Sequence, residues 1–152
     1  MPQRTPSSAA GFSLVELLVV VAILGVLTAI AVPTLQTYRN RSRIAAVVST
    51  AEAIRASLAG FAANDAENKY PPSAAITDYA TLRAVVNAHG GDLPADHVFT
   101  VLQYTRFDGD GDGVEEGYSL RLKVQGVPDS QVGHQILVTP GGVFRCSGGD
   151  PC

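Results

Sequence analysis

Cysteine, histidine and net positive charge are all scarce in this sequence of 152 residues. The two cysteines, Cys146 and Cys152, have no histidine beside them, which argues against a metal site built from thiolates. His89, His97 and His134 are scattered singly, as surface or structural histidines usually are. The sequence contains no nucleophile motif and no phosphate-binding loop, so it argues against an enzyme. A net charge of −3 argues in the same way against a generally nucleic-acid-binding surface.

What the sequence does contain is one long apolar segment, residues 12–32, interrupted only by Ser13, Glu16 and Thr28. As a helix with a rise of about 1.5 Å per residue, this segment spans roughly 30 Å, the thickness of a hydrocarbon core. A charge inside a membrane segment is costly unless it is paired, and such residues are usually functional. Glu16 is therefore expected to have a partner.

Two ordinary interpretations of the apolar segment explain it only in part. Ala29-Ile30-Ala31 resembles a small-x-small cleavage site, so the segment could be a secretory signal peptide cut after Ala31. However, Glu16 interrupts the apolar core, which is also long for a signal peptide. A plain single-span anchor explains the length but neither Glu16 nor the Gly11–Phe12 junction before the segment.

The hexapeptide GFSLVE at residues 11–16, followed by apolar residues, closely resembles the prepilin signal of type IV pilins and type II secretion pseudopilins. The resemblance implies that prepilin peptidase removes a leader of residues 1–11 by cleaving after Gly11, and methylates the new amino terminus at Phe12. Glu16 occupies the acidic position of that family. A neighbouring subunit's amine at Phe12 would neutralise the Glu16 carboxylate inside an apolar filament core and favour one axial register between subunits.

The helix is expected to continue beyond the membrane. Pro33 follows the apolar segment, where a kink is expected rather than a stop. Apolar residues then recur at steps of three and four, from Leu35 and Tyr38 to Ala62, which predicts an amphipathic helix ending near Asn64. Residues 12–32 would form the transmembrane and polymerisation helix, and residues 33–64 its amphipathic continuation.

Residues 65–152 read as a globular region. A short helix is predicted at Tyr79–Ala88, capped by Asp78. Strand signals occur at residues 97–107, 118–127, 135–139 and 143–146. Together with the resemblance, these elements predict an α+β, pilin-like fold in which the long N-terminal helix packs on a four-stranded antiparallel β-sheet.

The connection between the first two predicted strands is rich in aspartate and glycine and is a candidate calcium loop. Alternating carboxylates direct oxygens to one point while glycines allow a tight curve, as in oxygen cages for Ca²⁺. The EF-hand template is only half met, because Ser119 stands where a bidentate glutamate belongs. A solvated hairpin turn is the alternative, since Asp-Gly is also a strong turn signal. The candidate ligands are Asp108, Asp110, Asp112, the carbonyl of Val114, Glu115 and Glu116.

The expected location is the inner membrane, with a single span and the C-terminal domain outside the cytoplasm, and later a pilus or periplasmic pseudopilus. Arg39, Arg41 and Arg43 would favour the opposite orientation under the positive-inside rule, and the specificity of the leader decides against it. On the oxidising side of the membrane, a disulfide between Cys146 and Cys152 would close a small C-terminal loop.

The resemblance implies a structural subunit of a type IV pilus or pilus-like filament. Its partners would be like or related pilin subunits, prepilin peptidase, an inner-membrane platform protein and an assembly ATPase. One alternative within the family is a pseudopilin of the type II secretion system. An alternative of another class is a monomeric, membrane-anchored calcium-binding module of the envelope.

Overall fold

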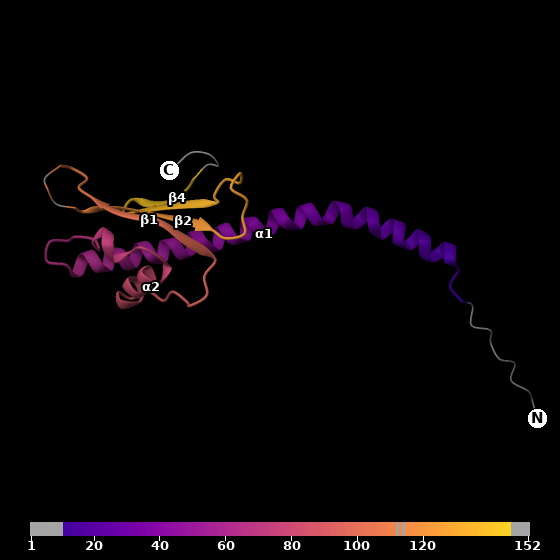
Figure 1. The fold of residues 1–152 in the computed structure, drawn as a ribbon, viewed down its shortest axis with the longest axis horizontal. Coiled ribbons are helices and arrows are strands. Elements are labelled where there is room, and N and C mark those ends of the chain that lie inside the picture. The colour runs from indigo at the N-terminus through magenta and orange to yellow at the C-terminus, as the bar shows by residue number, and fades with distance from the viewer. Residues whose placement is uncertain (1–10, 112, 114, 147–152) are drawn as a thin grey trace, which may run out of the picture. The chain divides into compact units, whose positions relative to one another are not determined.

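The computed structural model describes residues 11–111, 113 and 115–146 (Figure 1). Its first element is the helix α1, Leu14–Asn64, which has 51 residues and continues through Pro33. The predicted long helix is confirmed, and the proline does not end it. The described chain divides into two compact units, one ending at Tyr38 and the other beginning at Arg39.

The first unit is an apolar helix without a core of its own. Its large apolar side chains from Phe12 to Tyr38 are all exposed. Within the described residues, α1 is the one helix that is long and apolar enough to cross a membrane, judged by length and composition alone. Its threonines add no unsatisfied hydroxyls, because Thr28 donates to the Leu24 carbonyl oxygen at 2.9 Å and Thr34 donates to that of Ile30 at 3.1 Å.

The second unit contains a four-stranded antiparallel sheet with the order β1-β2-β3-β4. In this sheet Tyr104 pairs with Leu120, Leu120 with Val138, and Val138 with Val143. A bulge between Val101 and Gln103 shifts the register of the first pair of strands. The strands are β1 (Phe99–Phe107), β2 (Gly117–Val124), β3 (Gln135–Thr139) and β4 (Gly142–Arg145).

The core of the second unit forms between α1 and one face of this sheet. The ribbon in Figure 1 shows the second part of α1 running along the sheet. The strand β2 alternates as its sequence predicts, since its apolar residues are fully buried and the residues between them are partly exposed. The predicted α+β fold is confirmed. The central residues of the core are Ile44, Val47, Ala51, Ile54 and Leu58 from α1, with Tyr118, Leu120, Leu122, Val124, Ile136 and Val138 from the sheet.

The first residues of the predicted amphipathic stripe lie outside the core. Leu35 and Tyr38 fit the three-and-four spacing, yet their exposed fractions are 54% and 64%. The buried stripe of α1 begins only at Ile44. The spacing records which face of the helix is apolar, but burial requires a partner surface, and within the described residues that surface starts beside Ile44.

A second helix, α2 (Tyr79–Ala88), completes the core with Leu82 and Val86. Its bounds match the prediction because its ends are encoded locally. The Asp78 carboxylate accepts the Thr81 backbone N–H at 2.8 Å, and the Thr81 hydroxyl accepts the Asp78 backbone N–H at 3.0 Å. This reciprocal capping box fixes the first turn. A short 3₁₀ helix, η1 (Ser73–Ala75), lies in the connection before it.

Candidate functional site: the amino-terminal helix and the acidic loop

The predicted processing residues lie just before α1. Gly11 and Phe12 have no regular secondary structure, and the exposed fraction of Phe12 is 77%. A Cβ atom placed on Gly11 would meet no other atom within 4 Å. Both residues flanking the Gly11–Phe12 peptide bond are exposed among the described residues, as access by a peptidase requires. Residues 1–10 of the predicted leader lie outside the described residues.

Glu16 lies in the first turn of α1 and is exposed. A carboxylate at this position is favoured by the positive end of the helix dipole. Glu16 is also the one charged side chain between Gly11 and Tyr38. Its surroundings within the helix are apolar, and the structure pairs it with no other described residue, as expected if its partner lies on another molecule.

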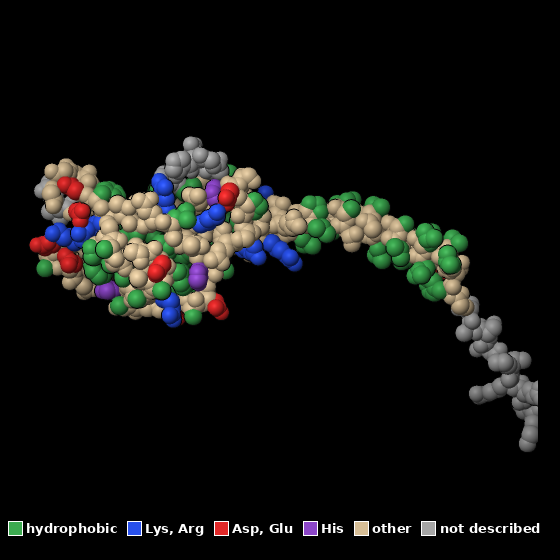
Figure 2. Space-filling model, in the orientation of Figure 1, with side chains coloured by type: hydrophobic (Ala, Val, Ile, Leu, Met, Phe, Trp, Pro, Cys, Tyr) green, Lys and Arg blue, Asp and Glu red, His purple; other side chains and the backbone are tan. Residues whose placement is uncertain are grey.

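Apolar side chains surround this part of α1 rather than forming a stripe on one side. A helix that is apolar all round is typical of one that lies in a membrane or inside an assembly. Figure 2 shows these side chains covering the helix before the globular unit. The exposed apolar residues are Phe12, Leu14, Val15, Leu17, Leu18, Val19, Val20, Val21, Ile23, Leu24, Val26, Leu27, Ile30 and Val32.

The acidic loop between β1 and β2 brings three of the predicted calcium ligands together. One carboxylate oxygen from each of Asp108, Asp110 and Glu116 lies within 4.8 Å of the others. The Asp108 carboxylate shapes the loop by accepting the backbone N–H groups of Gly111 at 2.6 Å and Gly113 at 2.8 Å. Both glycines have positive φ angles, 85° and 87°, which other residues rarely adopt. Converging carboxylate oxygens on a curved loop suit a hard cation.

The two neighbouring glutamates of this loop have different roles. Glu115 is not part of the converging group, because its Oε2 atom accepts a hydrogen bond from Arg106 Nε at 2.6 Å and forms an ion pair with Arg106 Nη2. Glu116 points the other way, and its Oε1 atom accepts the Gly109 N–H at 2.9 Å. The Glu116 Oε2 atom is buried and has no hydrogen-bond partner among the described residues. Two further predicted ligands, Asp112 and Val114, lie outside the described residues.

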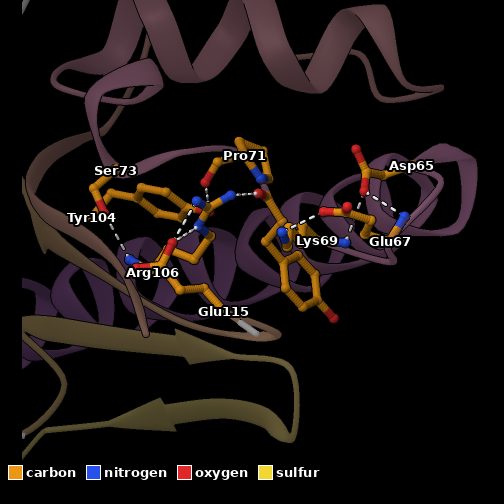
Figure 3. Close-up of polar contacts among 9 residues, drawn as sticks. Asp65, Glu67, Lys69, Pro71, Ser73, Tyr104, Arg106 and Glu115 are labelled. Carbon is orange, nitrogen blue, oxygen red and sulfur yellow. Dashed lines mark hydrogen bonds and ion pairs between the residues drawn. The ribbon is translucent and has the colours of Figure 1, made fainter. Parts of the chain in front are cut away.

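Arg106 was not singled out by the sequence, yet it joins the acidic loop to the connection that follows α1 (Figure 3). Its side chain is 19% exposed, and its Nη1 donates to the Tyr70 carbonyl oxygen at 2.9 Å. Its backbone N–H donates to Ser73 Oγ at 2.9 Å. Two positions earlier on β1, the Tyr104 hydroxyl donates to the Pro71 carbonyl oxygen at 2.9 Å. These contacts hold residues 70–73 against the end of β1.

Asp65 organises the start of the same connection, also visible in Figure 3. Its carboxylate accepts the backbone N–H groups of Glu67 at 3.0 Å and Lys69 at 3.2 Å. These hydrogen bonds hold the pKa of the Asp65 carboxyl below its usual value. Glu67 and Lys69 form an ion pair with each other. The turn also places Asn68 at a positive φ of 54°.

The C-terminal cysteines are only partly covered by the structure. Cys146 is 3% exposed, and its backbone N–H donates to the Gln135 carbonyl oxygen at 3.0 Å. Cys152 lies outside the described residues, so the disulfide between them stays a prediction. Two of the histidines have structural surroundings, since Nδ1 of His89 lies 2.8 Å from the Val85 carbonyl oxygen and Nδ1 of His134 lies 3.0 Å from that of Gln131.

Comparison with known proteins identifies the amino-terminal segment. The sequence profile of the prokaryotic N-terminal methylation motif matches residues 6–32. A fimbrial protein of Pseudomonas aeruginosa is 47% identical over 45 residues, which is 30% of this chain and 29% of the relative. The type IV major fimbrial protein FimA of Dichelobacter nodosus is 46% identical over 48 residues, 32% of this chain and 31% of the relative.

A fimbrial protein of Neisseria meningitidis is 35% identical over 57 residues, which is 38% of this chain and 34% of the relative. The matches therefore span about a third of the length of these curated relatives. No solved structure shows a significant match to the chain. The similarity to fimbrial proteins therefore lies in the methylation motif and the helix that follows it.

Proposed function

We propose that this protein is a structural subunit of a type IV pilus or pilus-like filament, which polymerises through the amino-terminal part of α1. The observation that carries the proposal is the methylation motif followed by a helix whose apolar side chains are all exposed up to Tyr38. Such a surface is not stable in water. A bilayer would cover it before assembly, and the same helices of neighbouring subunits would cover it in the filament.

Processing would prepare this helix for assembly. Prepilin peptidase would cleave after Gly11 and methylate the amine of Phe12. Glu16 would then lie on the helix one turn after that amine and would pair with the amine of a neighbouring subunit. An unpaired carboxylate in an apolar core is costly, so a subunit placed in the wrong axial register would be disfavoured.

The remaining partners follow from the same proposal. A single span in the inner membrane would leave the globular unit outside the cytoplasm, where a platform protein and an assembly ATPase would drive polymerisation. A pseudopilin of the type II secretion system would share every one of these features. The relatives compared above are fimbrial proteins, which favours the pilus as the first proposal.

The proposal is tested by the chemistry of the mature amino terminus and by the charge of Glu16. Mass spectrometry should find methylated Phe12, whereas an intact leader or cleavage after Ala31 would refute the proposal. Glu16→Gln keeps the shape of the side chain and removes its charge, and it should abolish filaments while membrane insertion stays normal. The matched control is Glu52→Gln, which removes an exposed carboxylate from the same helix and should leave assembly unchanged.

We further propose that the acidic loop binds Ca²⁺ through Asp108, Asp110 and Glu116. Support comes from the convergence of their oxygens and from the buried Oε2 atom of Glu116 that no described donor satisfies. A cation at this point would reduce the repulsion between the carboxylates and join the two ends of the loop. The predicted ligands Asp112 and Val114 would add further oxygens.

Adjacent glutamates offer a matched test of the calcium proposal. Millimolar calcium should raise the melting temperature of the wild-type protein, and Glu116→Gln should remove that rise. Glu115→Gln should retain it, because Glu115 pairs with Arg106 instead. No calcium-dependent rise in the wild type would leave the loop as a plain turn. A chain that binds calcium but stays monomeric would favour the membrane-anchored calcium module.

A further inference from the structure

The globular unit begins with three arginines, Arg39, Arg41 and Arg43, here called the basic collar. Arg43 donates to the Gly126 carbonyl oxygen at 2.9 Å. Because a carbonyl group is neutral, this hydrogen bond does not compensate the positive charge of Arg43. Arg39 and Arg41 are exposed and have no hydrogen bond or ion pair with any described residue. A loop beside the collar contains Asp129, but that carboxylate pairs with Lys123 at 3.0 Å. The collar is therefore a site of positive charge without a counter-charge of its own.

The other end of the unit carries the opposite charge. Carboxylates from the connection after α1 and from the acidic loop lie together there and are joined through Arg106 (Figure 3). This end contains six carboxylates and two cations, Lys69 and Arg106, so its net charge among the described residues is −4. A bound Ca²⁺ would still leave it negative. The residues of this acidic end are Asp65, Glu67, Asp108, Asp110, Glu115 and Glu116.

The helix itself sets the distance between the two ends. From Arg41 to Asn64, α1 rises by roughly 35 Å at about 1.5 Å per residue. Charges so far apart are screened from each other, because the Debye length is about 8 Å at physiological salt. Figure 2 shows several acidic side chains at the end of the globular unit where the acidic loop lies. Neither end can neutralise the other within one molecule, so both are available to a second one.

We propose that the basic collar of one copy binds the acidic end of a second copy of this chain. The inference rests on the proposed filament, in which copies point in the same direction and the acidic end of one faces the basic collar of another. A head-to-tail contact of this kind does not close on itself and therefore generates a fibre. The two copies are offset along the helix axis by about 35 Å, the length that separates the two charged ends of one copy.

A second copy fits this surface better than an anionic lipid does. The chain itself supplies a counter-charge, and it lies at the opposite end, where a parallel copy needs it. A lipid headgroup would explain the arginines alone and would leave the acidic end unused. Electrostatic complementarity of this kind selects partner and register more than it adds affinity.

Zero-length cross-linking tests the contact directly. Arg41→Lys preserves the charge and introduces an amine that carbodiimide couples to a nearby carboxylate. In filaments made from isotopically mixed subunits, mass spectrometry should find position 41 joined to Glu67, Asp108, Asp110 or Glu116 of another copy. Arg55→Lys is the control, because Glu52 lies 2.9 Å from Arg55 within the same chain and should give only intramolecular links. Filaments in which position 41 joins no carboxylate of the acidic end would overturn the proposal.

Charge reversal separates this inference from the proposed function. Arg39→Glu combined with Arg41→Glu should lower filament yield by about tenfold, because like charges then meet, while methylation of Phe12 stays normal. A normal filament yield would refute the collar contact and leave the filament proposal intact. If the double variant forms filaments normally but no longer binds phosphatidylglycerol vesicles, the basic collar binds lipid instead. Wild-type protein that forms no filament and lacks methylated Phe12 would refute both.

Discussion

The two units of this chain use apolar residues in opposite ways. Up to Tyr38, α1 exposes its apolar side chains and has no core of its own, whereas from Ile44 onward the same helix buries them against the sheet. Both parts are helical, and both contain valine, isoleucine, leucine and alanine. The two parts differ in the surface that covers them. The sheet of the same chain covers the second part, and in the proposed function a bilayer or neighbouring subunits cover the first.

The polar residues follow the same division. Between Gly11 and Tyr38 the one charge is Glu16, and the structure offers it no partner within the described chain. In the globular unit, Arg106, Asp65 and Asp78 all have hydrogen-bond partners that fix the local backbone. These polar residues of the globular unit thus serve its fold, whereas Glu16 fits the proposed assembly.

Removal of residues 1–38 is the strongest test of this division. Every buried apolar residue that the structure describes lies at Ile44 or later, so the remaining chain should keep its core and fold. We expect a monomer that is soluble without detergent and forms no filaments. Circular dichroism, analytical ultracentrifugation and electron microscopy would measure these three properties. An unfolded or aggregated product would show that the globular unit depends on the apolar helix.

Matched leucine truncations along α1 compare the two units in one helix. Leu58 is fully buried, and Leu58→Ala should lower the free energy of unfolding by roughly 2–5 kcal/mol because it leaves a cavity in the core. Leu24 is exposed, and Leu24→Ala should change the unfolding of the globular unit by less than about 0.5 kcal/mol. Chemical denaturation in detergent gives both values. Equal effects at the two positions would contradict the division.

The elements of the globular unit could be predicted because their signals are local. The alternation in β2 and the capping box of α2 each lie within about ten residues, and both predictions are confirmed. The sequence does not predict that Leu35 and Tyr38 stay exposed, because spacing along a helix does not show where the partner surface begins.

The contacts of Arg106 with Tyr70, Ser73 and Glu115 could not be predicted from the sequence, and the reason is the bulge in β1. Phe99 and Val101 face the core, and simple alternation would continue with Gln103 and Thr105. The extra residue at the bulge shifts the inward face to Tyr104 and Arg106. The sequence also could not show that Glu115 and Glu116 have different roles, because this difference depends on where the Arg106 side chain points.

Replacement of Arg106 tests how firmly the globular unit fixes its own loops. Arg106→Gln removes the ion pair to Glu115 and the hydrogen bond to the Tyr70 carbonyl oxygen from a side chain that is 19% exposed, and it should cost about 2 kcal/mol of folding stability. Hydrogen exchange should speed up at residues 69–73, which Arg106 holds against β1. Arg55→Gln removes an ion pair whose arginine is 40% exposed, and it should lower the folding stability less than Arg106→Gln does. Unchanged exchange in the Arg106 variant would show that other contacts hold the connection.

The smallest expected effect concerns Asp65, whose pKa is lowered by the backbone N–H groups of Glu67 and Lys69. A carboxyl whose pKa is lower in the folded state stabilises the protein above its unfolded pKa of about 3.9, and this contribution is lost as the pH falls through the folded value. Asp65→Asn keeps an oxygen that can accept both N–H groups but no longer titrates. The variant should therefore be slightly less stable than the wild type at pH 7.

At a pH well below the folded pKa of Asp65, the two proteins should unfold at the same urea concentration, because the wild-type carboxyl is then neutral as well. Urea unfolding at several pH values from 7 downward measures this convergence. A constant difference between the two proteins across that range would mean that Asp65 acts through its shape alone. Convergence would show that the hydrogen bonds of its charged form stabilise the connection after α1. That result would place the contribution of Asp65 in folding, whereas Glu16, the lone carboxylate of the other unit, is expected to act only in assembly.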